Sequence, residues 1–276
     1  MIITDDFVYI HYPKTGGSFV TYVLKQLYRY KKNYKFLDNL LPKRVMNKVL
    51  RFQKISNRIQ GFIDTNIHRT CHDIPEEHRN KPILTTIRNP YDSLVSHYEF
   101  GWWKTHTEEE FGFRIMEKIK NKFPTFPDLT FSEYINLWNC TLLPEKFKNV
   151  NLKSKESIGI ETFDFIRFFF RNYQEVLAKI DKDYKCYVNH QTYKADMFKV
   201  HFINTDRLNQ ELYNFLLDIG WKSKEIAFVL NLKKIFPKEG GRTEDQAWEK
   251  YYTHELKSTI RKKERLIFDL FPEFDV

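Results

Sequence analysis

Five consecutive residues near the start of the chain have the chemistry of an anion site: Lys14, Thr15, Gly16, Gly17 and Ser18. The two glycines let the backbone approach a bound group closely, and a helix beginning here would point its first N–H groups at that group. Lys14 adds a positive charge, and the hydroxyls of Thr15 and Ser18 add hydrogen-bond donors. These residues predict a site for a phosphate-like group, and the structural alternative is a simple glycine turn with a solvated lysine.

A second pair of residues could bind another phosphate-like group. Arg88 follows the β-branched run 82–87, and Ser96 comes eight residues later, two turns into a predicted helix. A guanidinium at a strand end can grip a phosphate with two hydrogen bonds, and the serine hydroxyl could reach the same group. The alternatives are an Arg88–carboxylate pair and a surface serine. Together with residues 14–18, the pair predicts a ligand with two separate phosphate-like groups.

The two motifs together resemble a known family. PKTGGS after an N-terminal strand, followed by RNPYDSLVSHY, is similar to the sulfotransferases that use 3'-phosphoadenosine 5'-phosphosulfate, and looks closer to their carbohydrate-type members. The resemblance covers residues 6 to 100 well, is looser over 205–220 and 244–271, and does not extend over 101–198. It implies that residues 14–18 hold the 5'-phosphosulfate, and that Arg88 and Ser96 hold the 3'-phosphate.

The resemblance also implies a reaction. A sulfuryl group would pass in line to a hydroxyl or amine of an acceptor, either a glycan or a small hydroxylated molecule, and adenosine 3',5'-bisphosphate would be released. Lys14 would stabilise the departing phosphate. Family members commonly close over the adenosine with a late basic loop, and Lys238 and Arg242 fit that role, although the family's usual RKG sequence is absent. No metal is expected.

The proton acceptor is expected to be a histidine, since imidazole titrates near neutral pH. In carbohydrate-type members a histidine upstream of the 3'-phosphate strand often has this role. The pattern H-x-T-x-x-x-I matches His68, Thr70 and Ile74, so His68 is the first candidate and His72 the second. His11, at the end of the first predicted strand, is interpreted as a packed residue that could also line the pocket.

The elements needed to position these residues are strands alternating with helices. Strands are predicted at 6–12, 82–87 and the start of 200–220, each followed by a helix. This alternation predicts an α/β fold with a central, mostly parallel sheet flanked by helices, and the resemblance implies a P-loop-like three-layer form. Ligands in such sheets bind at the carboxyl ends of the strands, where both motifs lie. We expect one domain over 1–276, with helical or loop insertions at about 31–60 and 101–198.

Local signals predict further details of these elements. Asp73 and Glu76 read as the N-cap and third residue of a helix, and Thr130 and Glu133 as a capping box. Residues 102–112 and 121–130 read as exposed insertions. A long amphipathic helix is expected at about 244–270.

Composition limits the classes of partner. The formal net charge of +9 favours an anionic ligand, but the basic residues are spread along the chain, which disfavours nucleic-acid binding. Three scattered cysteines form no metal-binding pattern and fit a reducing compartment. No signal peptide and no membrane-length apolar stretch is recognised, so a cytoplasmic enzyme is expected. A catalytically inactive nucleotide-binding relative is an alternative, as is a P-loop kinase or nucleotide hydrolase, although the lysine of that loop follows its glycines. The oligomeric state stays open.

Overall fold

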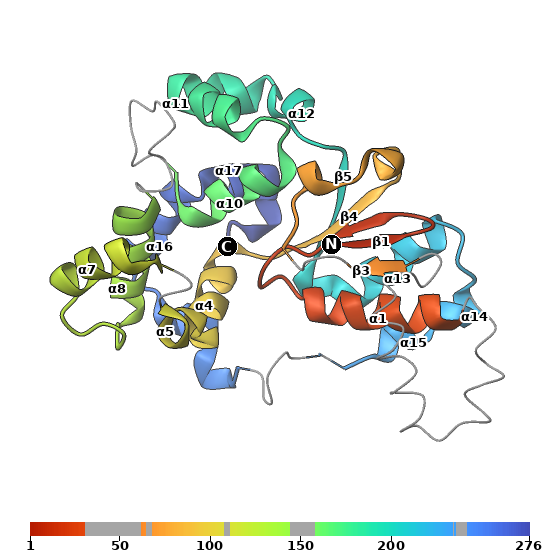
Figure 1. The fold of residues 1–276 in the computed structure, drawn as a ribbon, viewed down its shortest axis with the longest axis horizontal. Coiled ribbons are helices and arrows are strands. Elements are labelled where there is room, and N and C mark those ends of the chain that lie inside the picture. Colours follow the sequence, from red (N-terminus) through yellow and green to blue (C-terminus); the bar gives the residue numbers. More distant parts are fainter. Residues whose placement is uncertain (31–61, 65–67, 108–110, 144–157, 234, 236–241) are drawn as a thin grey trace. The chain divides into compact units, whose positions relative to one another are not determined.

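The computed structural model describes residues 1–30, 62–64, 68–107, 111–143, 158–233, 235 and 242–276 (Figure 1). They form two compact units, each built from two stretches of chain. The first unit comprises Met1–Arg88 and Lys199–Gly241, and the second comprises Asn89–Phe198 and Arg242–Val276. Each unit is described by itself.

The first unit contains a five-stranded sheet with the strand order β3-β1-β2-β4-β5. The strands are β1 (Ile2–Thr4), β2 (Val8–Ile10), β3 (Phe62–Asp64), β4 (Ile83–Ile87) and β5 (Val200–Asn204). The pairs β2–β4 and β4–β5 are parallel, whereas β1 is antiparallel to both of its neighbours. Four strands therefore run in one direction, which confirms the prediction of a mostly parallel α/β sheet.

Helices α1 (Gly17–Tyr30) and α13 (Leu208–Asp218) pack on this sheet through one apolar core. The predicted apolar face of the first helix is confirmed, because its five members are all buried: Phe19, Val20, Val23, Leu24 and Leu27. The short helices α14 (Ser223–Ile226) and α15 (Phe228–Asn231) follow α13 and contribute Ile226 and Val229 to the same core. The chain enters α1 directly from β2, so residues 14–18 lie at the carboxyl edge of the sheet.

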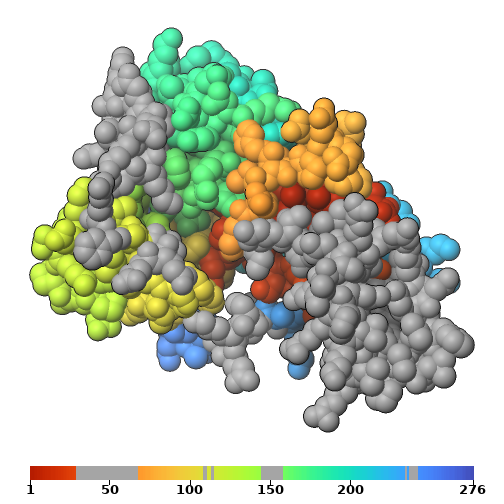
Figure 2. All heavy atoms as spheres, viewed as in Figure 1, coloured from red at the N-terminus to blue at the C-terminus, as the bar shows by residue number. Residues whose placement is uncertain are grey.

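The second unit is mainly helical. Its helices are α4 (Pro90–Phe100), α5 (Trp102–Thr105), α7 (Phe113–Lys122), α8 (Phe131–Asn136), α10 (Ile160–Phe169), α11 (Tyr173–Asn189), α12 (Tyr193–Asp196), α16 (His254–Lys263) and α17 (Arg265–Leu270). A π-helical segment, Leu137–Leu142, continues from α8. Figure 2 shows α11 at the surface, and Val176, Leu177 and Ile180 on its inner face are buried.

Local capping rules succeeded at one predicted helix start and failed at another. The capping box of Thr130 and Glu133 at the start of α8 is confirmed. Asp73, however, is not an N-cap: it ends the 3-10 turn Cys71–Asp73, and its carboxylate accepts hydrogen bonds from the backbone and hydroxyl of Thr70. The correction has a simple cause, because a carboxylate three residues after a threonine completes a capping box just as readily as it starts one.

Two other predictions for the second unit are wrong. The supposed exposed insertions contribute buried apolar side chains, namely Trp103, Phe111, Phe123 and Leu129. The long helix at 244–270 is replaced by the 3-10 turns Glu244–Gln246 and Trp248–Tyr251, followed by α16 and α17. The helix begins only at His254, where the Thr253 hydroxyl accepts a hydrogen bond from the Leu256 amide. It is interrupted at Glu264, whose carboxylate accepts a hydrogen bond from the Thr162 amide of α10.

Within the described residues, no helix combines the length and the apolar character that crossing a membrane requires.

Candidate functional site

The loop between β2 and α1 has an unusual backbone. Lys14 has a φ of 60° and Gly16 a φ of 90°, both in the left-handed region that glycine favours and lysine does not. The carbonyl oxygen of Lys14 accepts a hydrogen bond of 3.0 Å from the Arg88 guanidinium. The carbonyl oxygen of Thr15 lies 2.9 Å from the hydroxyl of Thr205, which donates to it. Two successive carbonyls of the loop are therefore held by side chains that follow β4 and β5.

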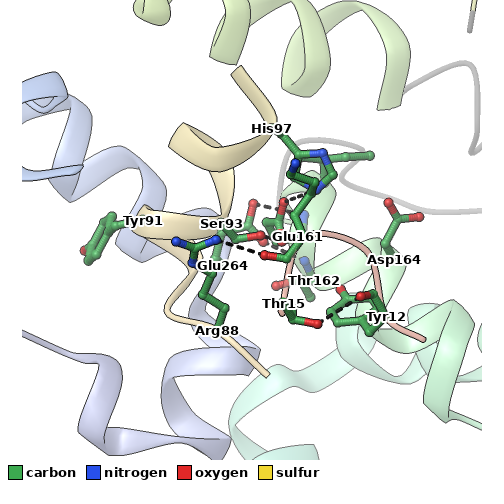
Figure 3. A network of polar contacts seen from close by, with 12 residues as sticks. Tyr12, Thr15, Arg88, Tyr91, Ser93, His97, Glu161, Thr162, Asp164 and Glu264 are labelled. Atoms are coloured by element: carbon green, nitrogen blue, oxygen red, sulfur yellow. Dashed lines mark hydrogen bonds and ion pairs between the residues drawn. The ribbon is translucent and has the colours of Figure 1, made fainter. Parts of the chain in front are cut away.

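The Thr15 side chain belongs to the scaffold. It is buried, and its hydroxyl donates to the carbonyl of Tyr12 at 2.9 Å (Figure 3). The Thr86 hydroxyl lies 2.6 Å from the same oxygen and can donate to it, and the Tyr9 hydroxyl lies 3.5 Å from Thr86. This chain of hydroxyls corrects the expectation that Thr15 offers its hydroxyl to an anion: its hydrogen is already bound to Tyr12. The backbone N–H of Thr15 is the group left for that task.

The first turn of α1 supplies amides that a ligand could use. The amide of Phe19 is bonded to the Gly16 carbonyl at 3.0 Å, whereas among the described residues the amides of Thr15, Gly16, Gly17 and Ser18 have no acceptor. This follows from helix geometry, because the first N–H groups of a helix have no carbonyl one turn earlier. The helix also places the positive end of its macrodipole here. Ser18 is half-buried in the same turn. These amides are the groups that the sequence analysis assigned to an anion.

Two histidines lie beside this turn. The His11 ring packs so closely on Gly17 that a β-carbon there would be 1.7 Å from a ring carbon. The His68 ring lies 5.3 Å from that of His11, centroid to centroid, and its Nδ1 is 3.4 Å from the His11 carbonyl oxygen. His72 is exposed on the turn Cys71–Asp73. The structure thus places His68 beside His11, and it places His11 at the predicted loop as a packed residue, which is how the sequence analysis interpreted it.

The two residues predicted to bind the second phosphate belong to different units. Arg88 is the last residue of one stretch of the first unit, and Ser96 is half-buried on α4 of the second unit. Arg88 has a role that the sequence did not predict, because its Nη1 donates to the Lys14 carbonyl. Any test of Arg88 as a phosphate ligand must therefore separate ligand contact from support of the loop.

The basic loop predicted to close over the ligand is described only at its end. Lys238 lies outside the described residues. Arg242 forms an ion pair with Asp92 and donates to the carbonyl of Gln246 at 3.3 Å. The expectation that Arg242 binds the donor is corrected to this extent: the guanidinium is used within the second unit, where it joins the 3-10 turn Glu244–Gln246 to α4.

Sequence reasoning missed a buried polar network in the second unit (Figure 3). Ser93 donates to one carboxylate oxygen of Glu161 at 2.9 Å, and His97 lies 3.9 Å from the other. Ser93 and His97 are four residues apart on α4 and so share a helix face. That spacing is the only sequence signal for the network, because the Glu161 that they share lies far along the chain on α10.

Glu264 continues this network. It is fully buried, and its carboxylate accepts the amides of Thr162 at 2.7 Å and Glu161 at 3.4 Å, which caps α10 from another part of the chain. Gly159 makes room for it, since a β-carbon there would be 1.8 Å from a carboxylate oxygen. Burial raises the pKa of Glu264 to about 7, and the amides and the nearby Lys263 oppose the shift.

We expect this carboxyl to make stability depend on pH. The unfolded chain loses the proton near pH 4.5, whereas the folded chain keeps it until about pH 7. The folded state therefore binds more protons in this window, and the free energy of unfolding falls by about 3 kcal/mol as the pH rises through it. Glu264→Gln should remove this slope in urea titrations between pH 5 and 8, and Glu249→Gln, at an exposed site, should retain it. Parallel curves for the wild type and Glu264→Gln would contradict the prediction.

Among the described residues, no group of three or more His, Cys, Asp or Glu side chains is placed to hold a metal ion. Comparisons with protein-family models, curated proteins and solved structures gave no match. The feature of this chain that bears most directly on function is therefore the geometry of the loop at residues 14–18.

Proposed function

We propose that this protein is a sulfotransferase that moves a sulfuryl group from 3'-phosphoadenosine 5'-phosphosulfate to a hydroxyl or amine of an acceptor. The observation that carries the proposal is the backbone of residues 14–18. Its carbonyls are bound by Arg88 and Thr205, and its amides stand at the first turn of α1. Such a turn binds a phosphate or sulfate group. The resemblance of the two motifs selects this donor among the anions that the turn would accept.

The residues of the two motifs and His68 divide the chemical tasks of this proposal between them. The amides of residues 15–18 hold the 5'-phosphosulfate. Lys14 stabilises the negative charge that grows on the bridging oxygen as its bond to sulfur breaks. The acceptor oxygen or nitrogen bonds to sulfur and gives its proton to His68, beside His11 and the loop. Arg88 and Ser96 bind the 3'-phosphate, and adenosine 3',5'-bisphosphate leaves. No metal is needed for these steps.

The finer fold and the acceptor belong to the same proposal. The strand–loop–helix arrangement of β2 and α1 supports a P-loop-like three-layer fold, in which the lysine precedes the glycines. The acceptor class is a glycan, with small hydroxylated molecules as the second class to screen, in a cytoplasmic setting. Residues 101–198 are expected to contribute to acceptor binding.

Ligand-induced stabilisation tests the donor. Adenosine 3',5'-bisphosphate without magnesium, at about 100 times its Kd, should raise the melting temperature by about 5 °C, because binding to the folded state alone adds about 2.7 kcal/mol. Adenosine 5'-monophosphate, which lacks the 3'-phosphate, should raise it less, as should ATP with magnesium.

The outcomes of the melting experiment separate the alternatives. A shift with ATP and magnesium but none with the bisphosphate would overturn the donor and favour a kinase or nucleotide hydrolase. A bisphosphate shift without turnover of labelled donor, across pools of glycans and small hydroxylated molecules, would favour an inactive relative.

A further inference from the structure

One threonine hydroxyl connects three segments at the carboxyl edge of the sheet. Thr205 follows β5, at the start of the 3-10 turn Thr205–Arg207. Its Oγ1 lies 2.9 Å from the carbonyl oxygen of Thr15 in the loop and 2.9 Å from that of Ile87, the last residue of β4. A hydroxyl has one hydrogen to donate, so the two carbonyls share it. The contact joins residues that are remote in sequence at the place where three parallel strands end.

The planarity of the peptide bond gives this contact a directional consequence. The carbonyl of Thr15 and the amide of Gly16 belong to one peptide plane, and in a trans peptide they point in opposite directions. When Thr205 holds the carbonyl toward the sheet edge, the Gly16 N–H must point away from it. Arg88 does the same for the next plane back, since it holds the Lys14 carbonyl and thereby sets the Thr15 N–H.

Without the Thr205 hydroxyl, the Thr15–Gly16 peptide would lose the hydrogen bond that holds its carbonyl in this orientation. Gly16 has a φ of 90°, and a glycine can leave that conformation at low energetic cost. Thr205 therefore restrains the residue with the greatest freedom in the loop through its hydroxyl.

We propose that Thr205 is a positioning residue of the anion site: its hydroxyl holds the Thr15 carbonyl so that the Gly16 amide faces the bound phosphate or sulfate. This inference rests on the proposed function, because it assigns a direction to an amide that the donor would use. An amide that already points at the anion binds it without a cost for reorientation. Loss of the Thr205 hydroxyl therefore weakens anion binding even where the fold persists.

Three variants test the role of the hydroxyl. Thr205→Val removes it at nearly constant shape and should weaken adenosine 3',5'-bisphosphate binding about tenfold in calorimetry, as expected for one hydrogen bond to a charged ligand. Thr205→Ser keeps the hydroxyl and should bind within about twofold of the wild type. Thr85→Val is the matched control: Thr85 is buried on β4 and donates to the Ile10 carbonyl at 2.8 Å, a similar bond that does not involve the loop.

A measurement on the wild type keeps the inference testable if Thr205→Val does not fold. Bound bisphosphate should slow hydrogen exchange of the Thr15 and Gly16 amides more than that of the core amides of α13. Unchanged exchange at Gly16 would overturn the inference, as would equal affinities of Thr205→Val and the wild type, or equal losses in Thr205→Val and Thr85→Val. If the wild type does not bind the bisphosphate, the proposed function itself is overturned. If the wild type binds and Thr205→Val binds equally well, only the role of Thr205 is overturned.

Discussion

His68→Ala is expected to bind adenosine 3',5'-bisphosphate as the wild type does and to lower the turnover number for sulfuryl transfer about 10²–10⁴-fold, the usual contribution of a general base. The physical reason is the position of the His68 ring, which lies beside His11. The Nδ1 of His68 lies 3.4 Å from the His11 carbonyl oxygen, so a hydrogen bond there would fix the ring in the tautomer that carries its proton on Nδ1 and its lone pair on Nε2. The measurement is transfer of labelled sulfate at saturating donor, with calorimetry for the bisphosphate.

The neighbouring histidine provides the control. His72→Ala changes an exposed ring on the turn Cys71–Asp73 and should keep turnover within about threefold of the wild type, as surface substitutions generally do. Normal turnover of His68→Ala together with loss in His72→Ala would move the base to His72. Normal turnover of both variants would remove this segment from the chemistry and leave His11 as the histidine at the loop.

The sequence predicted the features that depend on near neighbours. The strand–turn–helix arrangement around residues 14–18 and the apolar face of α1 were predicted correctly because glycine freedom and helical periodicity act over a few positions. The same holds for β4 and for the capping box at Thr130. The strands β1 and β3 were missed. Each has three residues, as β2 has, but β2 is marked by the proline and glycine turn that follow it, and the other two have no such signal.

The features that escaped prediction depend on partners far along the chain. Thr205 is an ordinary threonine in sequence, and its contact with the Thr15 carbonyl exists only because β5 lies beside β4 in the sheet. Glu264 lies in the stretch predicted as one long amphipathic helix, but it interrupts that helix and its carboxylate caps α10. The Thr15 hydroxyl was misassigned partly for this reason, because Thr86 lies 2.6 Å from it, and partly for a local one, because it donates to the carbonyl of Tyr12 three residues earlier.

Gly17→Ala is expected to reduce affinity for adenosine 3',5'-bisphosphate about 10²-fold, because the packing of His11 against the loop must change. A β-carbon at this position would lie 1.7 Å from the Cδ2 and 1.8 Å from the Nε2 of His11. The ring or the first turn of α1 must then shift by more than 1 Å, and a displacement of that size in a binding site typically costs about this factor. The backbone conformation at this position permits alanine, since Gly17 has no positive φ and alanine favours helices.

A second substitution distinguishes this steric cause from a need for glycine itself. His11→Ala in the Gly17→Ala background removes the ring that the new methyl group meets, so bisphosphate affinity should recover at least tenfold relative to Gly17→Ala alone. Calorimetry on the wild type, both single variants and the double variant forms a complete cycle, and a positive coupling between the two positions is the expected result. If Gly17→Ala binds as the wild type does, the packing of His11 on this turn does not shape the anion site. If the double variant is no better than Gly17→Ala, the loss comes from the loop amides, which must then approach the ligand too closely to admit a β-carbon.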